Sequence, residues 1–130
     1  MLNILFIADI IGSPGRDAVR ALLPALRERH DAHLVIANVE NAAGGFGFNR
    51  DSAEALSAAG VDVFTGGNHL WDRKESVAYV ADEPRLVRPA NLPPGTPGEG
   101  ARIFHAADGN TVGVVNLLGR VFMKEADCPF

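Results

Sequence analysis

The sequence lacks the features that mark secreted and membrane proteins. It has one cysteine, Cys128, which excludes an internal disulfide and suits a reducing compartment. No apolar run approaches the roughly 20 residues that a membrane-spanning helix needs. The apolar stretch at residues 2–8 has no Lys or Arg before it and no small-residue cleavage site after it, which argues against a secretory signal. We therefore expect a cytoplasmic protein with no membrane partner.

The chain also lacks an excess of basic residues. Twelve Lys and Arg stand against 16 Asp and Glu, for a net charge of −4. General attraction to nucleic acid is therefore not expected, although a bound metal could still supply the positive charge for a local phosphate site. The length of 130 residues, with 47% hydrophobic and 22% charged, is typical of one globular domain and excludes a disordered chain.

Short apolar runs alternate with helical patterns along most of the chain. Nearly continuous apolar runs at 2–8, 34–39 and 61–65 are typical of strands buried on both faces. Apolar spacing and capping residues predict three helices. The first spans 16–29 and is kinked or restarted at Pro24. The second spans about 50–59 and is capped by Asn49 or Asp51, and the third spans 73–80 and is capped by Asp72. The alternation predicts an α/β layered fold with a largely parallel sheet.

The remainder of the chain has weaker patterns. The proline-rich stretch 84–100 is predicted to be irregular, and 119–130 has no clear pattern. Two apolar stretches at 101–106 and 111–117 flank Asp108-Gly109-Asn110, which predicts a β-hairpin.

Each of the three predicted parallel strands ends in residues that can bind a metal. These residues are Asp9 after the first strand, Glu40 and Asn41 after the second, and Asn68 and His69 after the third. Taken singly, each has an ordinary explanation as a turn former, helix cap or surface side chain. Because ligands bind at the carboxyl ends of parallel strands, the three together predict one site. Two carboxylates, two amides and an imidazole suit Mn, Fe or Zn.

The motifs at these strand ends resemble those of known enzymes. Gly67-Asn68-His69 resembles the Gly-Asn-His motif of the calcineurin-like metallophosphoesterases, and Ala8-Asp9 stands where that superfamily has Gly-Asp. Longer stretches resemble the YmdB family of bacterial phosphodiesterases, namely 6–15, 37–47, 66–72, 88–91 and 116–123. The resemblance covers essentially the whole chain. It implies the layered α/β/β/α metallophosphoesterase sandwich, of which this chain would form the N-terminal half.

Three departures from the wider superfamily agree with the YmdB branch. Ile11 stands where a histidine is usual, Glu40 replaces the usual bridging Asp, and Leu70 stands where many members have an acidic residue. The resemblance implies that Asp9 and Asn41 ligate one metal, that Asn68 ligates the other, that Glu40 bridges them, and that His69 donates a proton.

The implied activity is hydrolysis of phosphodiesters, including 2′,3′-cyclic nucleotides. By resemblance the cofactor is a pair of divalent ions, with iron the first choice and Mn or Zn the alternatives. Two metals would bind the phosphate and acidify a bridging water, whose hydroxide attacks phosphorus. His69 would protonate the leaving oxygen. The neutral amides of Asn41 and Asn68 would limit the negative charge of the site and keep the metals electrophilic.

The metal shell predicted from this chain is incomplete. Members of the family run about twice as long, and their second half supplies three further histidine ligands. His30 and His33 flank the wrong end of the second strand, and His105 lies inside the predicted hairpin. We therefore expect residues 1–130 to be a single, incomplete metallophosphoesterase domain. An uncovered apolar edge or face would favour self-association, so a homo-oligomer is a further expectation.

Two other functions compete with the enzyme. One is a non-catalytic regulator that binds RNA or a nucleotide in the same cleft; it would tolerate His69→Ala, which the enzyme would not. Arg16, near the start of the first predicted helix, is the candidate phosphate-binding residue. The other is a metal-free nucleotide-binding module, but the turn 12–15 lacks the Gly-Lys-Ser/Thr ending of a phosphate loop. Phe46 and Trp71 are either base-stacking or core residues.

Overall fold

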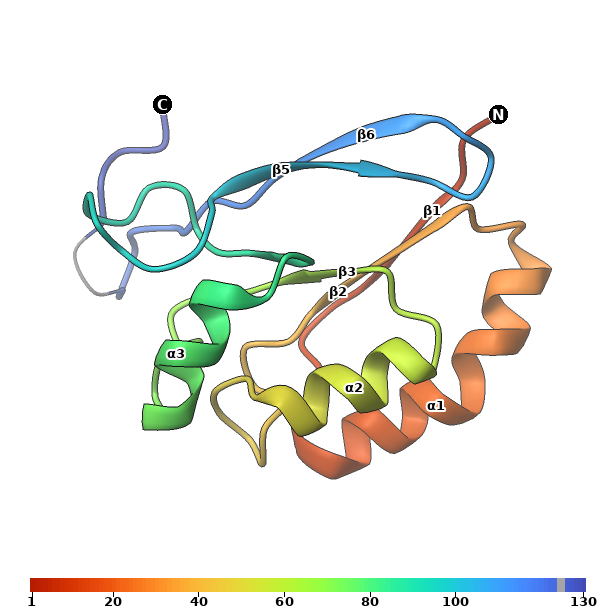
Figure 1. Cartoon of the computed structure of the whole chain (residues 1–130), viewed down its shortest axis with the longest axis horizontal. Helices are drawn as coiled ribbons and strands as arrows, with labels where there is room; N and C mark the ends of the chain where they lie inside the picture. The colour runs from red at the N-terminus through yellow and green to blue at the C-terminus, as the bar shows by residue number, and fades with distance from the viewer. Residues whose placement is uncertain (124–125) are drawn as a thin grey trace.

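A four-stranded parallel sheet forms the middle layer of the molecule. The computed structural model describes residues 1–123 and 126–130, so positions 124 and 125 of the unpatterned stretch 119–130 lie outside the described residues. The strand order follows the chain, from β1 to β4, and every neighbouring pair is parallel (Figure 1). The strands are β1 (Ile4–Ile7), β2 (Leu34–Asn38), β3 (Val63–Thr65) and β4 (Leu86–Val87).

Helices and a hairpin lie on opposite sides of this sheet. The helices are α1 (Gly12–Arg29), α2 (Arg50–Ala58) and α3 (Lys74–Asp82), and the hairpin is β5 (Ala101–His105) with β6 (Thr111–Val115). Figure 1 shows α1 and α2 side by side beneath the sheet, with the hairpin above it. Within the described part of the chain, none of the helices is long and apolar enough to cross a membrane. This arrangement is the α/β layered fold that the alternation predicts.

The core has one part on each side of the sheet. On the helix side, Leu23 and Leu56 pack with Phe64 of β3, and all three side chains are almost fully buried. On the hairpin side, Ile36 of β2 packs with Val114 of β6. Most of β2 and all of β3 are therefore buried, as their continuous apolar runs predict.

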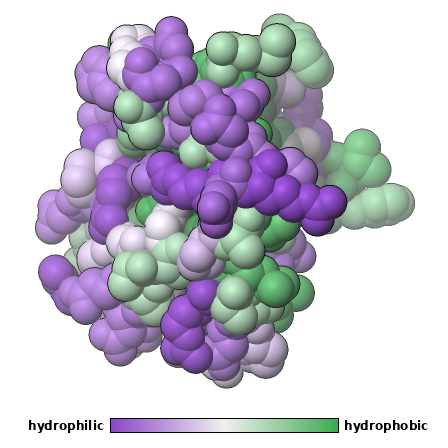
Figure 2. Space-filling view, turned by 90° about the vertical axis from the view of Figure 1, so that its right-hand side faces the viewer, coloured by the Kyte–Doolittle hydropathy of each residue, from purple (hydrophilic) through white to green (hydrophobic). Residues whose placement is uncertain are grey.

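The edge strand β1 departs from the prediction of burial on both faces. Leu5 and Ile7 pack against the helix-side core, but Ile4 is 46% exposed and Phe6 is 57% exposed. The hairpin core rests on β2, β3 and β4, so the outer face of β1 stays open beside β6. A hollow of about 400 Å³ separates the two strands. In Figure 2, hydrophobic residues gather along one border of a largely hydrophilic face.

This open face confirms the expectation of an uncovered apolar surface. The self-association that such a surface would favour stays a prediction. The interpretation of residues 1–130 as a single, incomplete domain also stays a prediction.

Three local predictions need correction. Helix α1 begins at Gly12 instead of residue 16 and does not restart at Pro24, beside which Leu23 is buried; its last turns are tied by the bond from Arg27 Nη1 to the Gly60 carbonyl at 2.9 Å. The stretch 84–100 contains the two-residue strand β4, too short to leave a sequence pattern. The N-cap of α3 is Arg73 and not Asp72, whose carboxylate bonds elsewhere.

The cap predicted for α2 is confirmed. Asn49 accepts from the Ser52 N–H at 3.1 Å, and the Ser52 hydroxyl in turn accepts from the Asn49 N–H, which completes a capping box.

Candidate metal and phosphate site

The segments that follow β1, β2 and β3 meet at one edge of the sheet. The Ile10 N–H donates to the Asn38 carbonyl at 3.1 Å, and the Val39 N–H donates to the Thr65 carbonyl at 2.9 Å. These bonds continue the parallel pairing beyond the strand ends, so the loops leave the sheet side by side. The loops bring together the residues that the sequence predicts for the site, namely Asp9, Glu40, Asn41, Asn68 and His69.

Asp9 and Asn41 pair across the first two strand ends. Asn41 Nδ2 donates to Asp9 Oδ1 at 2.7 Å, while the Asn41 carbonyl accepts from the N–H groups of Gly12 and Gly45. The pair uses the amide nitrogen of Asn41 and leaves its Oδ1, the atom that can bind a cation. A hollow of about 570 Å³ opens beside Asp9, lined by the start of α1 and by Gly44 and Gly45.

The Glu40 carboxylate reaches from the second strand end to the third. Its Oε2 accepts from the His69 N–H at 2.9 Å. The carboxylate lies directly against Gly67, where a Cβ would overlap both of its oxygens. Because Glu40 and Asn41 are neighbours in the chain, Glu40 connects the Asp9–Asn41 pair to the Gly67–His69 segment.

Gly67→Ala is expected to displace the Glu40 carboxylate and leave the fold nearly unchanged. The Gly67 φ lies in the ordinary range, and the obstructing atoms are the end of a flexible side chain. We expect the free energy of unfolding to change by less than about 1 kcal/mol. The His69 amide proton, having lost its carboxylate acceptor, should shift upfield in the NMR spectrum.

Two other glycines provide the controls. Gly113→Ala in β6 meets open space, so the His69 amide should keep its position. Gly66→Ala would press on the fully buried Leu70 side chain, so it should lower stability by about 1–3 kcal/mol. An unmoved His69 amide in Gly67→Ala would show that Gly67 does not accommodate Glu40.

The His69 side chain is held by a residue that was predicted to do something else. His69 Nδ1 lies 2.6 Å from Asp72 Oδ2, so the Asp72 carboxylate bonds to the imidazole instead of capping α3. Between them, Leu70 is fully buried and Trp71 packs partly buried against the core. The two apolar residues anchor the turn, and His69 and Asp72 stay accessible.

Arg16, the candidate phosphate-binding residue, contacts the neighbouring loop. Its Nη1 donates to the Ala42 carbonyl, which ties α1 to the loop that follows β2. This contact places Arg16 next to the site and gives it a structural role. Its contact with substrate stays a prediction.

The side chains at this edge carry several oxygen donors. Among residues 1–123 and 126–130, no three His, Cys, Asp or Glu side chains are grouped so that they could hold a metal ion alone. The donors that the loops bring together are the carboxylates of Asp9 and Glu40 and the amides of Asn41 and Asn68, and oxygen donors suit divalent cations. Because Gly67 has no side chain to displace the Glu40 carboxylate, this set fits a cation that takes further ligands from elsewhere.

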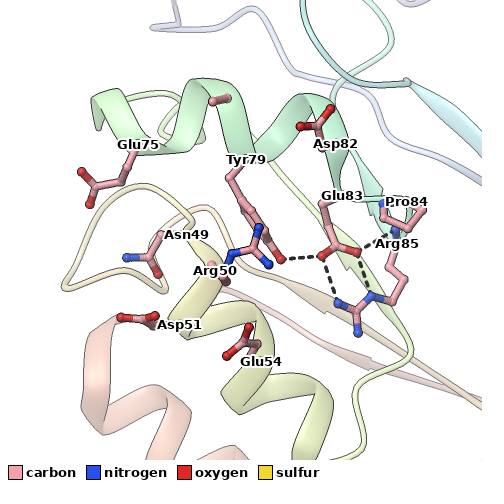
Figure 3. Close-up of a pocket in the computed structure, with 11 residues that line it drawn as sticks. Asn49, Arg50, Asp51, Glu54, Glu75, Tyr79, Asp82, Glu83, Pro84 and Arg85 are labelled. Carbon is pink, nitrogen blue, oxygen red and sulfur yellow. Dashed lines mark hydrogen bonds and ion pairs between the residues drawn. The ribbon is translucent and has the colours of Figure 1, made fainter.

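A second hollow, of about 620 Å³, lies between α2 and α3 (Figure 3). Its wall contains a network centred on Glu83, which is buried and accepts from Arg85 at 2.7 Å and from the Tyr79 hydroxyl at 2.5 Å. Burial alone would raise the pKa of Glu83, but the bonds from Arg85 and Tyr79 outweigh it and lower that pKa. Burial and the bond to Glu83 raise the pKa of Tyr79, which stays a donor. The network joins the end of α3 to β4.

Glu83→Gln is expected to lower the free energy of unfolding by about 1–3 kcal/mol, because it removes a buried charge-assisted acceptor. The lowered pKa in the folded state means that the ionised carboxyl adds stability above its usual pKa of 4.5, and that this contribution is lost as the pH falls. The difference between the two proteins should therefore shrink below that pH in denaturant titrations. Glu54→Gln, at an exposed position in the same hollow, is the control. Equal losses in both variants would contradict the assignment.

Comparison with known proteins decides the family. The profile of the YmdB-like proteins matches residues 5–130. The chain belongs to the YmdB-like family. A 2′,3′-cyclic-nucleotide 2′-phosphodiesterase of Bacillus subtilis (strain 168) is 46% identical over 129 residues, which make up 99% of this chain and 48% of that protein. The resemblance stated from the motifs is thereby confirmed.

Two solved structures share the fold of this YmdB-like chain. A hypothetical protein from Thermus thermophilus matches with a TM-score of 0.88 at 46% identity, over 97% of this chain and 48% of that one. A novel phosphatase from Mycoplasma pneumoniae matches with a TM-score of 0.88 at 33% identity, over 99% of this chain and 49% of that one. The chain spans about half the length of the relatives it matches.

Sequence reasoning missed three residues around the site. In the sequence, Gly67 stands out only as part of the Gly-Asn-His motif and Asp72 only as a helix cap. Asn116 carried no prediction of its own, yet its Nδ2 donates to the carbonyls of Gly66 and Val87 at 2.8 and 3.0 Å, which ties the end of β6 to the ends of β3 and β4. The one available signal for Asn116 was its place in the stretch 116–123 that resembles the family.

Proposed function

We propose that this chain contributes the active site of a phosphodiesterase that hydrolyses small phosphodiesters such as 2′,3′-cyclic nucleotides. The observation that carries the proposal is the position of Glu40, whose carboxylate connects the Asp9–Asn41 pair to the His69 backbone. The name and 46% identity of the Bacillus subtilis relative support this substrate class. The single cysteine of the chain supports a cytoplasmic location.

The proposed cofactor is a pair of divalent ions, iron by family resemblance or else Mn or Zn. Asp9, Asn41, Glu40 and Asn68 would hold them. Bound ions supply positive charge to the phosphate oxygens and make a water molecule more acidic. The Asp9–Asn41 bond occupies the Asn41 amide nitrogen and leaves its Oδ1 for this purpose, and the absence of a side chain at Gly67 leaves room for the Glu40 carboxylate.

Residues of this chain would also admit the phosphate group and protonate the leaving oxygen. The hollow beside Asp9 is bordered by Gly44 and Gly45, whose lack of side chains lets a phosphate group approach the backbone. When water attacks phosphorus and the bond to the leaving oxygen breaks, the electron pair stays on that oxygen. His69 then supplies the proton that turns the leaving oxygen into a hydroxyl.

The direct test measures metal-dependent hydrolysis of a 2′,3′-cyclic nucleotide. It compares the 130-residue chain with a chimera in which this chain replaces the matching half of the Bacillus subtilis relative. We expect the chimera, loaded with Fe or Mn, to hold about two metal ions and to turn over. A folded chimera that binds nucleotide without hydrolysing it, with either metal, would replace the proposal with the binding function.

A further inference from the structure

The exposed pair of His69 and Asp72 has no evident structural purpose. The His69 side chain is 47% exposed and that of Asp72 is 33% exposed, with 2.6 Å between Nδ1 and Oδ2. An accessible contact between two side chains of this kind contributes little to stability. Helix α3 begins at Lys74 without a side-chain cap, because the carboxylate of Asp72, two residues before it, bonds to the His69 imidazole instead. A residue type that usually caps a helix is thus used to hold a histidine.

Hydrogen bonds and a buried side chain hold the backbone that carries the pair. The Asp72 N–H donates to the His69 carbonyl at 3.2 Å and closes a turn between the two residues. Leu70, inside this turn, is fully buried against the core. On the other side, the His69 N–H donates to Glu40. His69 is therefore held at its backbone N–H by Glu40 and at its imidazole ring by Asp72.

We propose that Asp72 is the positioning residue of the proton donor His69. A carboxylate only accepts hydrogen bonds, so the His69 nitrogen facing it, Nδ1, must carry a proton. Nε2 is then the nitrogen that gains and gives up the transferable proton, and Asp72 fixes the direction of the ring. The catalytic consequence rests on the proposed function, whereas the tautomer follows from the contact alone.

The first test observes the tautomer without any activity. In long-range ¹H–¹⁵N spectra of the chain, neutral His69 should carry its proton on Nδ1. Asp72→Ala should move that proton to Nε2, whereas Asp72→Asn, whose amide oxygen can still accept, should keep it on Nδ1. Asp17→Ala, which removes another exposed carboxylate paired to Arg20, should leave His69 unchanged. An Nε2–H tautomer in the parent chain, or an unaltered tautomer in Asp72→Ala, would overturn the proposal.

The second test separates positioning from folding through the leaving group. In the metal-loaded chimera, Asp72→Ala should lower kcat roughly 10- to 100-fold on a 2′,3′-cyclic nucleotide, whose leaving alkoxide needs a proton. On bis-p-nitrophenyl phosphate, whose leaving nitrophenolate needs no proton, Asp72→Ala should change kcat little. KM should stay constant on both substrates. Asp72→Asn should restore most of the loss. Equal losses on both substrates would indicate damaged folding and contradict positioning.

The two tests fail independently. If His69→Ala leaves hydrolysis of both substrates intact, the proposed proton donor is wrong, but the tautomer result still assigns Asp72 as the group that orients the ring. If the tautomer does not respond to Asp72→Ala while His69→Ala is inactive, the proposed function stands and the positioning role is rejected.

Discussion

Glu40→Gln is expected to lower metal-dependent hydrolysis by roughly 10³-fold while the fold stays intact. Glutamine keeps the shape of the side chain and a carbonyl oxygen that can accept from the His69 N–H, now 2.9 Å from Oε2. What it removes is the negative charge between the Asp9–Asn41 pair and the His69 segment. Metal content by mass spectrometry and hydrolysis of a 2′,3′-cyclic nucleotide, both in the chimera, measure the effect.

The matched control for this change is Glu54→Gln, which removes an exposed carboxylate on α2 in the hollow between α2 and α3. It should keep both metal content and turnover. Full metal loading and activity in Glu40→Gln would mean that this carboxylate is not a ligand, and the proposed bridging role would have to be given up.

His69→Ala is expected to lower turnover of a 2′,3′-cyclic nucleotide roughly 10²- to 10⁴-fold, the usual contribution of a general acid. Metal content should change little, because Glu40 bonds to the His69 backbone and not to its ring. On bis-p-nitrophenyl phosphate the loss should be much smaller, since nitrophenolate leaves without a proton. The measurement is kcat on both substrates with the same metal-loaded chimera.

This variant also distinguishes a catalyst from a binder. His30→Ala, at the C-cap of α1, is the control that removes an imidazole elsewhere and should leave both rates unchanged. If the parent chimera binds a nucleotide but does not hydrolyse it, and His69→Ala binds it equally well, the regulator interpretation replaces the enzyme.

Much of the site could be predicted because it depends on backbone periodicity. Buried runs at β2 and β3 and helical spacing in α1 predict parallel strands, and parallel strands bring their carboxyl ends to one edge. Asp9, Glu40 and His69 follow from that rule and from the motifs. The same rule cannot place side-chain atoms, so the bond from the His69 N–H to Glu40 and the space that Gly67 provides required the structure.

The errors came from interactions that local patterns do not encode. Asp72 has the residue type and position of a helix cap, but a histidine three residues earlier competes for its carboxylate at 2.6 Å. The run at β1 looks buried on both faces, yet the hairpin rests on its neighbours and leaves Phe6 57% exposed. Which faces are covered depends on packing between distant segments, and an apolar run cannot specify it.

We propose that the ends of β1, β2 and β3 together form one divalent-cation site. Titration of the ¹⁵N-labelled chain with Mn²⁺ tests it most directly, because a paramagnetic ion broadens the amide signals nearest to it. We expect signals around Asp9, Glu40 and Asn68 to broaden together, at a Mn²⁺ concentration that leaves the rest of the spectrum sharp. Broadening centred instead on the acidic hollow between α2 and α3, or none at the strand ends, would contradict it.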